Sequence, residues 1–261
     1  MSILKKIIDN KINEVENDKK SISLSQLKNN LIKKNNNFKK KLQEFKKNNK
    51  TAIIAEVKKA SPSKGILLDN FDHLAIAEEY VRANAACLSI LTEKKYFLGS
   101  KKYLSEIKKK FNIPVLCKDF FIDIYQVYEA AYIGADCILI LLNSVEDHLI
   151  KDLLQAASDC GLDVILEIHN EQEMIRALNF KNVILGINNR NLNTFETDIR
   201  TTVNIFNKFD LSNKTIICES GISSKKDINF IKTETGINNF LIGESLIKSD
   251  SIYSKLVELN S

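Results

Sequence analysis

The sequence predicts an α/β fold, a (β/α)8 TIM barrel, preceded by an N-terminal helical extension. From residue 52 onward, eight short apolar runs rich in β-branched residues recur, and each is followed by a stretch with helical periodicity. Alternating strands and helices are typical of right-handed βαβ units around a parallel sheet. Continuous apolar strands indicate a sheet covered on both faces, and eight units are the number that closes such a barrel.

The first fifty residues follow a different pattern, with no Gly or Pro and with many Lys and Asn. Apolar residues recur at helical spacing between Ile3 and Val15, which predicts a first helix. A second helical stretch covers about 24–45, with Ser23 or Ser25 as its N-cap. Periodic apolar positions of this kind indicate packed helices and are not expected of a linker.

The two predicted units are the extension, residues 1–50, and the catalytic barrel, residues 51–261. A helix with an apolar stripe must bury that stripe, and the helices of the barrel already cover its sides. We therefore expect the extension to pack on the mouth of the barrel. The alternative is a helix that plugs the bottom of the barrel, where residues usually serve stability.

The predicted strands of the barrel are apolar runs that begin with AIIAEV and end with NFLI, at residues 52–57, 86–91, 114–117, 137–142, 163–168, 183–188, 215–218 and 239–242. A doubly wound open sheet is the alternative arrangement of such units. That fold usually shows a Gly-rich turn after its first strand, and this sequence has none there.

The composition excludes several classes of protein. The 261 residues carry 38 Lys+Arg against 33 Asp+Glu, and 44% are hydrophobic, which is enough for a sizeable core and argues against disorder. Four of the cations are Arg and the Lys are spread along the chain, which disfavours a nucleic-acid surface. No apolar stretch reaches the roughly 18 residues of a membrane helix, and the N-terminus shows no secretory signal. We expect a cytoplasmic protein that binds neither nucleic acid nor membranes.

The five cysteines do not indicate a metal site. Four of them lie inside apolar runs, and no pair has the spacing of metal ligands. We expect them to be small buried residues of a protein in a reducing compartment.

Polar residues stand at the carboxyl ends of several predicted strands, where such a barrel carries its active site. Glu56 and Lys58 alternate along the first run and so face the same side, while Lys118, Glu167 and Asn188 take equivalent places on later runs. Any one of them alone is more often a solvated rim charge. Lysines and carboxylates that converge on one mouth shift each other's pKa values, which suits them to proton transfer.

Two further polar residues stand at the ends of predicted strands. His169 follows Glu167 by two residues, which places it to face the same way, and Glu219 ends the seventh run. Because no second His or Cys lies near His169, we expect no metal ion there.

Two of the eight glycines indicate a phosphate site. Gly221 and Gly243 come directly after the seventh and eighth runs, where barrels of this kind commonly hold phosphate on backbone N–H groups. Ser61, Ser220 and Arg190 are further candidate donors. The alternative is that each glycine only opens a tight turn.

Taken together, these segments resemble the indole-3-glycerol phosphate synthase family, in its monofunctional form. The resemblance covers nearly the whole chain in order, and the stretch EVKKASPSKG is the family's signature. The other matching stretches are LSILTEKKYFLGS, VLCKDFFIDIYQVYEAAYIGAD, LEIHNEQE, GINNRNLNTFETD, ESGISSKKDI and FLIGESL, with SILKKIIDNKINEVENDKK in the extension.

The resemblance implies a lyase of tryptophan biosynthesis that acts on 1-(2-carboxyphenylamino)-1-deoxyribulose 5-phosphate. The ring closes onto the ribulose carbonyl carbon, carbon dioxide leaves, water leaves, and the product is indole-3-glycerol phosphate. No cofactor is implied, because the cyclised iminium beside the carboxylate accepts the electrons of decarboxylation.

The resemblance also implies a role for each residue of the site. Lys118 is implied as the acid on the carbonyl oxygen, Glu167 as the acid/base of dehydration, and Lys58 as a substrate contact that assists catalysis. Glu56 and Asn188 are implied to orient the anilino nitrogen and the hydroxyl groups. The remaining substrate-binding positions are the apolar wall of Phe97 and Phe120, and the ligand contacts Ser61, Arg190, Ser220, Gly221, Gly243 and Glu244, the last through its N–H because its carboxylate would repel phosphate.

Two other functions are compatible with a phosphate-binding barrel. A phosphoribosylanthranilate isomerase predicts a Cys/Asp acid–base pair at strand ends, which the sequence does not show. A non-catalytic barrel would be expected to lose Lys118 or Glu167, and both are present. We expect a monomer, with a weak dimer as the alternative, that binds a small phosphorylated substrate and carries no second catalytic domain.

Overall fold

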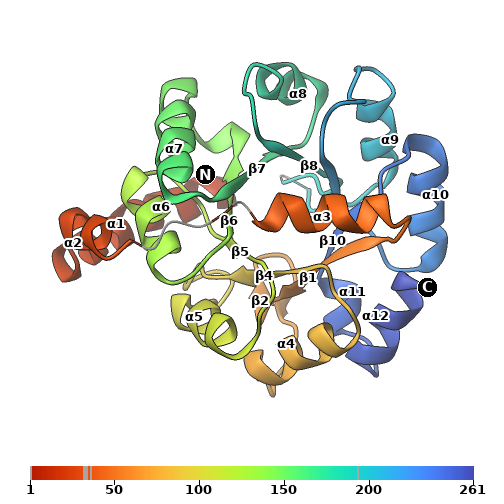
Figure 1. Ribbon diagram of the computed structural model, residues 1–261, viewed down its shortest axis with the longest axis horizontal. Helices are drawn as coiled ribbons and strands as arrows, with labels where there is room; N and C mark the ends of the chain where they lie inside the picture. The colour runs from red at the N-terminus through yellow and green to blue at the C-terminus, as the bar shows by residue number, and fades with distance from the viewer. Residues whose placement is uncertain (1, 32–34, 36, 193) are drawn as a thin grey trace.

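The computed structural model describes residues 2–31, 35, 37–192 and 194–261. Its centre is a closed barrel of eight parallel strands in which β1 (Ala52–Val57) pairs with both β4 and β10 (Figure 1). The other strands of the barrel follow in chain order: β4 (Cys87–Leu91), β5 (Val115–Lys118), β6 (Cys137–Leu141), β7 (Asp163–Ile168), β8 (Ile184–Asn188), β9 (Ile216–Glu219) and β10 (Asn239–Ile242). All eight predicted strands and the predicted barrel are confirmed.

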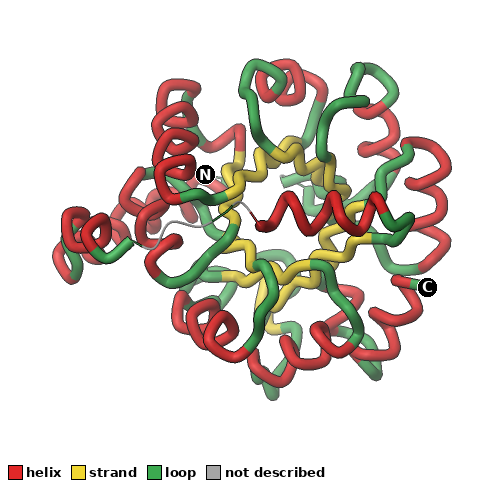
Figure 2. The backbone as a smooth tube through the Cα atoms, in the orientation of Figure 1, coloured by secondary structure: helices red, strands yellow, loops and turns green. Residues whose placement is uncertain are grey.

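An outer ring of helices covers the barrel, as the periodicity of the connecting stretches predicts (Figure 2). Their apolar faces and the outward side chains of the strands form one continuous core. The helices of the ring are α4 (His73–Arg82), α5 (Lys101–Lys110), α6 (Ile124–Tyr132), α7 (Asp147–Cys160), α8 (Glu171–Ala177), α9 (Arg200–Phe206), α10 (Lys225–Thr235), α11 (Glu244–Ile247) and α12 (Ile252–Asn260), with a short 3-10 turn at Leu142–Ser144.

A second apolar cluster fills the interior of the barrel. Strand side chains alternate between the two sides of the sheet, so residues such as Ile54, Leu116, Ile165 and Ile217 point inward. All five cysteines are buried, as their apolar surroundings predict.

The extension forms three helices, α1 (Ile3–Ser21), α2 (Leu24–Asn29) and α3 (Asn37–Lys47). The expectation of one helix over 24–45 is therefore wrong. Ser23 caps α2 with a capping box, but that helix ends at the C-cap Asn30, and Leu31 and Asn35 lie outside any helix. The part of the predicted helix at residues 32–34 and 36 lies outside the described residues.

The helices of the extension lie at different parts of the barrel. α3 crosses the end of the barrel at which the strands begin, and its Phe38, Leu42 and Phe45 complete the interior cluster (Figures 1 and 2). The backbone N–H of Lys39 donates to Asp163 at the start of β7, at 2.8 Å. α1 and α2 instead pack beside α6, and α1 contacts loops at the opposite end. α1 therefore contacts the loops after β4 and β5, whereas α3 lies across the end of the barrel at which the strands begin.

Beyond β1 the chain forms a short antiparallel hairpin, β2 (Ala60–Ser61) with β3 (Gly65–Ile66), which the sequence did not predict. Within the described part of the chain, no helix is both long and apolar enough to cross a membrane.

Candidate active site

A layer of polar side chains lies above the apolar layers of the barrel interior. Glu56, Lys118, Glu167, Asn188 and Glu219 each stand two residues after an inward apolar residue or glycine on their strand, so they also point inward. The three glutamates and Asn188 are buried, and Lys118 is half-buried. The side chains alternate along each strand as the sequence predicts, and these strand-end residues converge on one mouth.

Glu56 lies between two lysines. Its Oε1 accepts a hydrogen bond from Lys58 Nζ at 2.5 Å, and its Oε2 accepts one from Lys118 Nζ at 3.0 Å. Burial alone would raise the pKa of Glu56, but the charges of Lys118 and Lys58 lower it to about 2. Burial would lower the pKa of Lys118, but Glu56, then Glu219 and Glu167, raise it above its usual range. At neutral pH Lys118 therefore carries a proton and Glu56 does not.

Glu167 forms the second centre of the mouth. Its Oε1 accepts a hydrogen bond from Asn188 Nδ2 at 2.7 Å and lies 3.3 Å from His169 Nε2. His169 Nδ1 lies 3.2 Å from Glu173 Oε2 on α8. Burial opposes ionisation, but His169 and Lys118 lower the pKa of Glu167 below its usual range. Glu167 is therefore ionised at neutral pH, which is the form of a carboxyl group that can accept a proton.

Glu219 belongs to the same mouth, as its place at the end of the seventh run indicates, although no role was predicted for it. Its Oε2 lies 3.6 Å from Lys118 Nζ, and both carboxyl oxygens are buried without a hydrogen-bond partner among the described residues. The carboxyl group of Glu219 fits here because residue 186 on β8 is a glycine, and a Cβ at that position would lie 2.1 Å from Glu219 Oε1. Burial, and then the charge of Glu167, raise the pKa of Glu219 to about 8. Glu219 thus holds a proton near neutral pH.

The raised pKa of Glu219 predicts a dependence of stability on pH. Because the folded state binds this proton more tightly than the unfolded state, whose carboxyl has a pKa near 4.5, Glu219 costs folding free energy as the pH rises from about 4.5 to about 8. Glu219→Gln, which mimics the protonated form, is expected to be more stable than the natural protein at pH 8.5 and equally stable at pH 4.5. Urea unfolding at both pH values measures this, and an equal difference at the two values would contradict it.

The aromatic pair lies on two neighbouring loops. Phe97 follows β4 and Phe120 follows β5, and their ring centroids are 6.2 Å apart with the planes tilted by 41°. Both rings remain partly exposed at the mouth, which leaves apolar surface for a planar ligand. Ser61 stands in the hairpin after β1, where it pairs with Gly65.

The loops after β8, β9 and β10 lie together. Ser245 Oγ donates to the carbonyl of Ile222 at 2.8 Å, which joins the Gly221 and Gly243 turns. Arg190 follows β8, and its guanidinium lies 3.5 Å from Glu244 Oε2. An open cavity of about 760 Å³ adjoins this region, lined by residues that include His169, Asn188 and Arg190.

The two glycines act for different physical reasons. Gly221 has φ +80°, a left-handed conformation, and follows Ser220, which has φ +65°. Gly243 has an ordinary φ of −134°, but a Cβ there would lie 2.5 Å from Glu56 Oε1 and 2.9 Å from Glu56 Cβ. Gly243 is therefore required for the position of Glu56, in addition to any contact with a ligand.

This difference predicts separate effects of two substitutions. Gly243→Ala is expected to displace Glu56 and lower kcat, because an added methyl group cannot share the space of the carboxyl. Gly221→Ala is expected to raise KM with a smaller effect on kcat, because its strain falls on the loop that is expected to hold phosphate. Steady-state kinetics of the two variants measures the split. A pure KM effect of Gly243→Ala would contradict the account.

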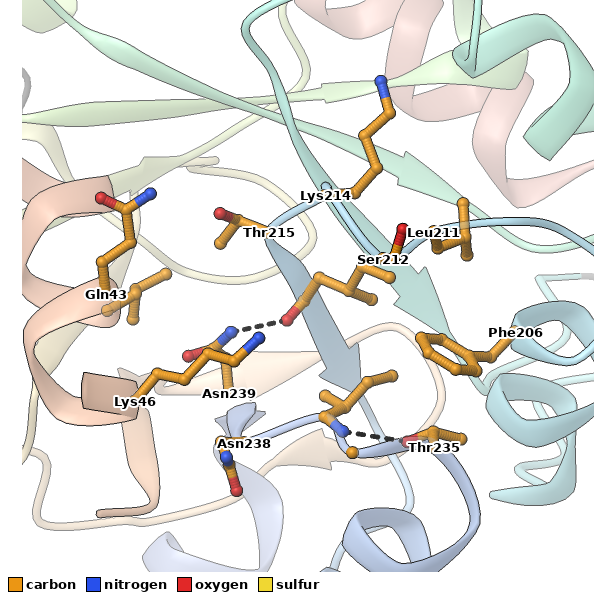
Figure 3. Close-up of a pocket in the computed structure, with 14 residues that line it drawn as sticks. Gln43, Lys46, Phe206, Leu211, Ser212, Lys214, Thr215, Thr235, Asn238 and Asn239 are labelled. Atoms are coloured by element: carbon orange, nitrogen blue, oxygen red, sulfur yellow. Dashed lines mark hydrogen bonds between the residues drawn. The ribbon is translucent and has the colours of Figure 1, made fainter. Parts of the chain in front are cut away.

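A smaller cavity lies at the opposite end of the barrel and takes no part in this site. It has a volume of about 220 Å³ and lies between α3 and the starts of β9 and β10. Figure 3 shows Gln43 and Lys46 of α3 on one side of this cavity and Phe206 on the other, and Asn239 donates to the carbonyl of Ile216. None of the acid or base groups of the mouth lines this cavity, so we assign the chemistry to the mouth.

The fold and the mouth define a (β/α)8-barrel enzyme with lysine and carboxylate acid–base groups at the ends of its strands. Residues 4–259 match the family model described as "Indole-3-glycerol phosphate synthase". The chain therefore belongs to the indole-3-glycerol phosphate synthase family, as its signature stretch indicates.

Relatives in this family are similar over most of the chain. An indole-3-glycerol phosphate synthase of Legionella pneumophila is 41% identical over 258 residues, 99% of this chain and 98% of the relative. Another, from Polynucleobacter asymbioticus, is 46% identical over 210 residues, 80% of this chain and 78% of the relative. Among solved structures, the tryptophan synthase alpha chain of Legionella pneumophila shares the fold, with a TM-score of 0.63, 12% identity, and coverage of 87% of this chain and 96% of that chain.

Proposed function

We propose that the mouth of the barrel catalyses the indole-3-glycerol phosphate synthase reaction with separate proton-transfer groups for ring closure and for dehydration. The substrate is 1-(2-carboxyphenylamino)-1-deoxyribulose 5-phosphate, and the product is indole-3-glycerol phosphate. The observation that carries the proposal is the pair of centres described above: an ammonium group with a raised pKa at Lys118 and a carboxylate with a lowered pKa at Glu167.

Lys118 is the proposed acid of ring closure. The ring carbon that bears the carboxylate bonds to the ribulose carbonyl carbon, and the carbonyl oxygen takes a proton from Lys118 Nζ. Carbon dioxide then leaves, and its electron pair returns to the iminium system of the ring. Glu56 holds the ammonium group by a 3.0 Å hydrogen bond, so the proton is fixed in direction before the substrate arrives.

Glu167 is the proposed acid/base of dehydration. Loss of the new hydroxyl as water needs a proton, and closure of the indole double bond releases one from carbon. The ionised state of Glu167 supports the base half of this exchange. Glu219, which keeps its proton near neutral pH, supports the acid half from the other side of Lys118.

The other residues are proposed to bind and orient the substrate. Lys58, Glu56 and Asn188 orient its nitrogen and hydroxyl groups, and Phe97 and Phe120 form the wall against the anthranilate ring. The phosphate group is assigned to the joined loops after β8, β9 and β10, through Arg190, Ser220, Gly221, Gly243 and the N–H of Glu244, and to Ser61 in the hairpin after β1. A monomeric state and a cytoplasmic location stay predictions.

The phosphate assignment predicts inhibition by inorganic phosphate. Backbone N–H groups at such turns bind phosphate weakly when it stands alone, so competition with the substrate is expected at tens of millimolar, roughly the strength of anion binding at helix N-termini. Initial rates at several phosphate concentrations measure it, with potassium chloride at equal ionic strength as the control. An unchanged KM would count against the assignment.

The reaction itself is tested by supplying the purified protein with two substrates. With the carboxyphenylamino substrate, indole fluorescence should rise, and with phosphoribosylanthranilate no isomerisation should occur. The opposite pattern would favour the isomerase. Absence of both activities in a folded protein would favour a non-catalytic barrel.

A further inference from the structure

The first helix carries a buried lysine on its apolar side. Lys11 lies one turn from Ile7 and one turn from Val15, and all three are buried. Its Nζ lies 2.7 Å from Asp119 Oδ1 and 2.8 Å from Glu14 Oε2. Burial alone would lower the pKa of Lys11, but Asp119 and Glu14 raise it above its ordinary value. A buried ammonium group is costly unless carboxylates pair with it, so the ion pairs to Asp119 and Glu14 are what allow Lys11 to be buried here.

Asp119 connects this lysine to the active site. It follows Lys118 directly in the chain, and its Oδ1 also accepts the backbone N–H of Phe120 at 2.8 Å. Its Oδ2 accepts the hydroxyl of Thr92 at 2.7 Å, and the N–H of Thr92 donates to the carbonyl of Lys118 at 3.1 Å. The carboxylate of Asp119 therefore holds the backbone after Lys118 directly, and through Thr92 it also holds the carbonyl of Lys118.

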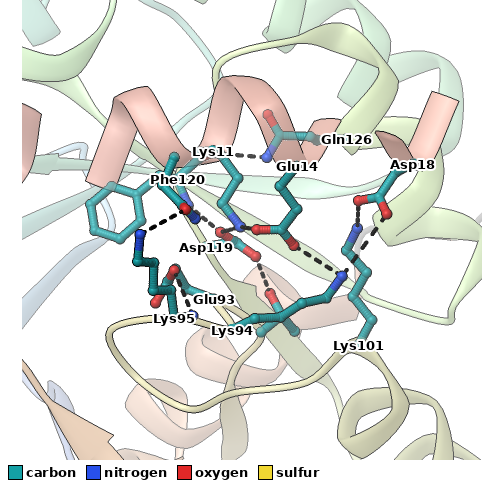
Figure 4. A network of polar contacts seen from close by, with 12 residues as sticks. Lys11, Glu14, Asp18, Glu93, Lys94, Lys95, Lys101, Asp119, Phe120 and Gln126 are labelled. Atoms are coloured by element: carbon teal, nitrogen blue, oxygen red, sulfur yellow. Dashed lines mark hydrogen bonds and ion pairs between the residues drawn. The ribbon is translucent and has the colours of Figure 1, made fainter. Parts of the chain in front are cut away.

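The same helix also reaches the loop that carries Phe97. Lys94 on that loop lies 3.3 Å from Glu14 Oε1 (Figure 4). Glu93 of the same loop accepts the backbone N–H groups of Tyr96 and Phe97. α1 thus contacts both loops of the aromatic pair, and Lys11 with Glu14 joins the two.

We propose that Lys11 is a positioning residue of the active site, which acts through Asp119 to fix the ammonium group of Lys118 and the ring of Phe120. This inference rests on the proposed function and extends it to a residue of the extension. A general acid must lie within hydrogen-bond reach of the group it protonates. A displacement of about 1 Å is expected to lower kcat/KM about 100-fold.

The test compares Lys11→Met with a matched control, Lys101→Met. Lys101 on α5 also ties α1 to the barrel, by ion pairs to Asp18 at 2.6 Å and Glu129 at 2.5 Å, but it has no contact with Asp119. Both variants are expected to melt at a lower temperature. At a temperature at which both are folded, Lys11→Met is expected to show a lower kcat and a higher KM, and Lys101→Met is expected to keep the kcat and KM of the natural protein.

Two results would overturn the proposal: natural kcat and KM in folded Lys11→Met, or the same kinetic loss in both variants. Because Lys11→Met leaves the buried Asp119 short of a partner, Lys11→Met with Asp119→Asn is the second variant. The double variant removes the unpaired charge of Asp119 but still lacks the ion pair between residues 11 and 119, so the loss of kcat and the rise of KM should persist. Recovery of turnover in the double variant would contradict the proposal. A natural protein without turnover would instead reject the proposed function.

Discussion

Lys118→Ala is expected to abolish turnover while the barrel stays folded. The variant lacks the only lysine that bridges Glu56 and Glu219 among the described residues, so ring closure loses its proton donor. Loss of a general acid lowers kcat roughly 100- to 10,000-fold. Glu56 keeps its hydrogen bond to Lys58, so one carboxylate of the pair retains a partner and the fold should tolerate the change.

Steady-state rates and circular dichroism of the same sample check this result. Lys102→Ala is the control, because it removes a lysine of α5 whose side chain is 75% exposed and forms an ion pair with Glu106 at 3.6 Å. Natural turnover is expected of the control. Near-natural turnover of folded Lys118→Ala would remove Lys118 from the mechanism.

Glu167→Gln is expected to show the second large loss. The substitution keeps the size of the side chain and an oxygen that can accept from Asn188, but it removes the negative charge beside His169. Proton transfer during dehydration is therefore lost, and kcat should fall roughly 100- to 10,000-fold with little change in KM.

Glu173→Gln is the matched control for this variant. It removes the other carboxylate that contacts His169, at 3.2 Å, and leaves Glu167 in place. Only a minor loss of kcat is expected. Equal losses in the two variants would mean that the charge of His169, and not the carboxylate of Glu167, controls the step.

Much of the site followed from the sequence because alternation along a strand is a strict geometric rule. Glu56, Lys118, Glu167 and Asn188 occupy equivalent places on four strands, and a closed parallel barrel brings such places together. The same rule applies to Glu219, but its burial depends on Gly186 of the neighbouring strand. That contact depends on the register between strands, which a single sequence does not reveal.

The extension shows where periodicity stops being informative. Spacing identifies an apolar stripe, yet it does not say which end of a barrel the stripe covers, and the chain uses α1 at one end and α3 at the other. Lys11 stands on the stripe itself, between Ile7 and Val15, while Ile12 is 50% exposed. A charged residue in an apolar stripe was the available signal of a buried ion pair, but its partner is more than one hundred residues away in the sequence.

The division of proton transfers between Lys118 and Glu167 is tested most directly by single-turnover reactions in which carbon dioxide release and indole fluorescence are followed in the same sample. With enzyme in excess over substrate, Glu167→Gln should release carbon dioxide without a matching rise in fluorescence. Lys118→Ala should give neither signal. Loss of both signals to the same extent in both variants would contradict separate groups for ring closure and dehydration.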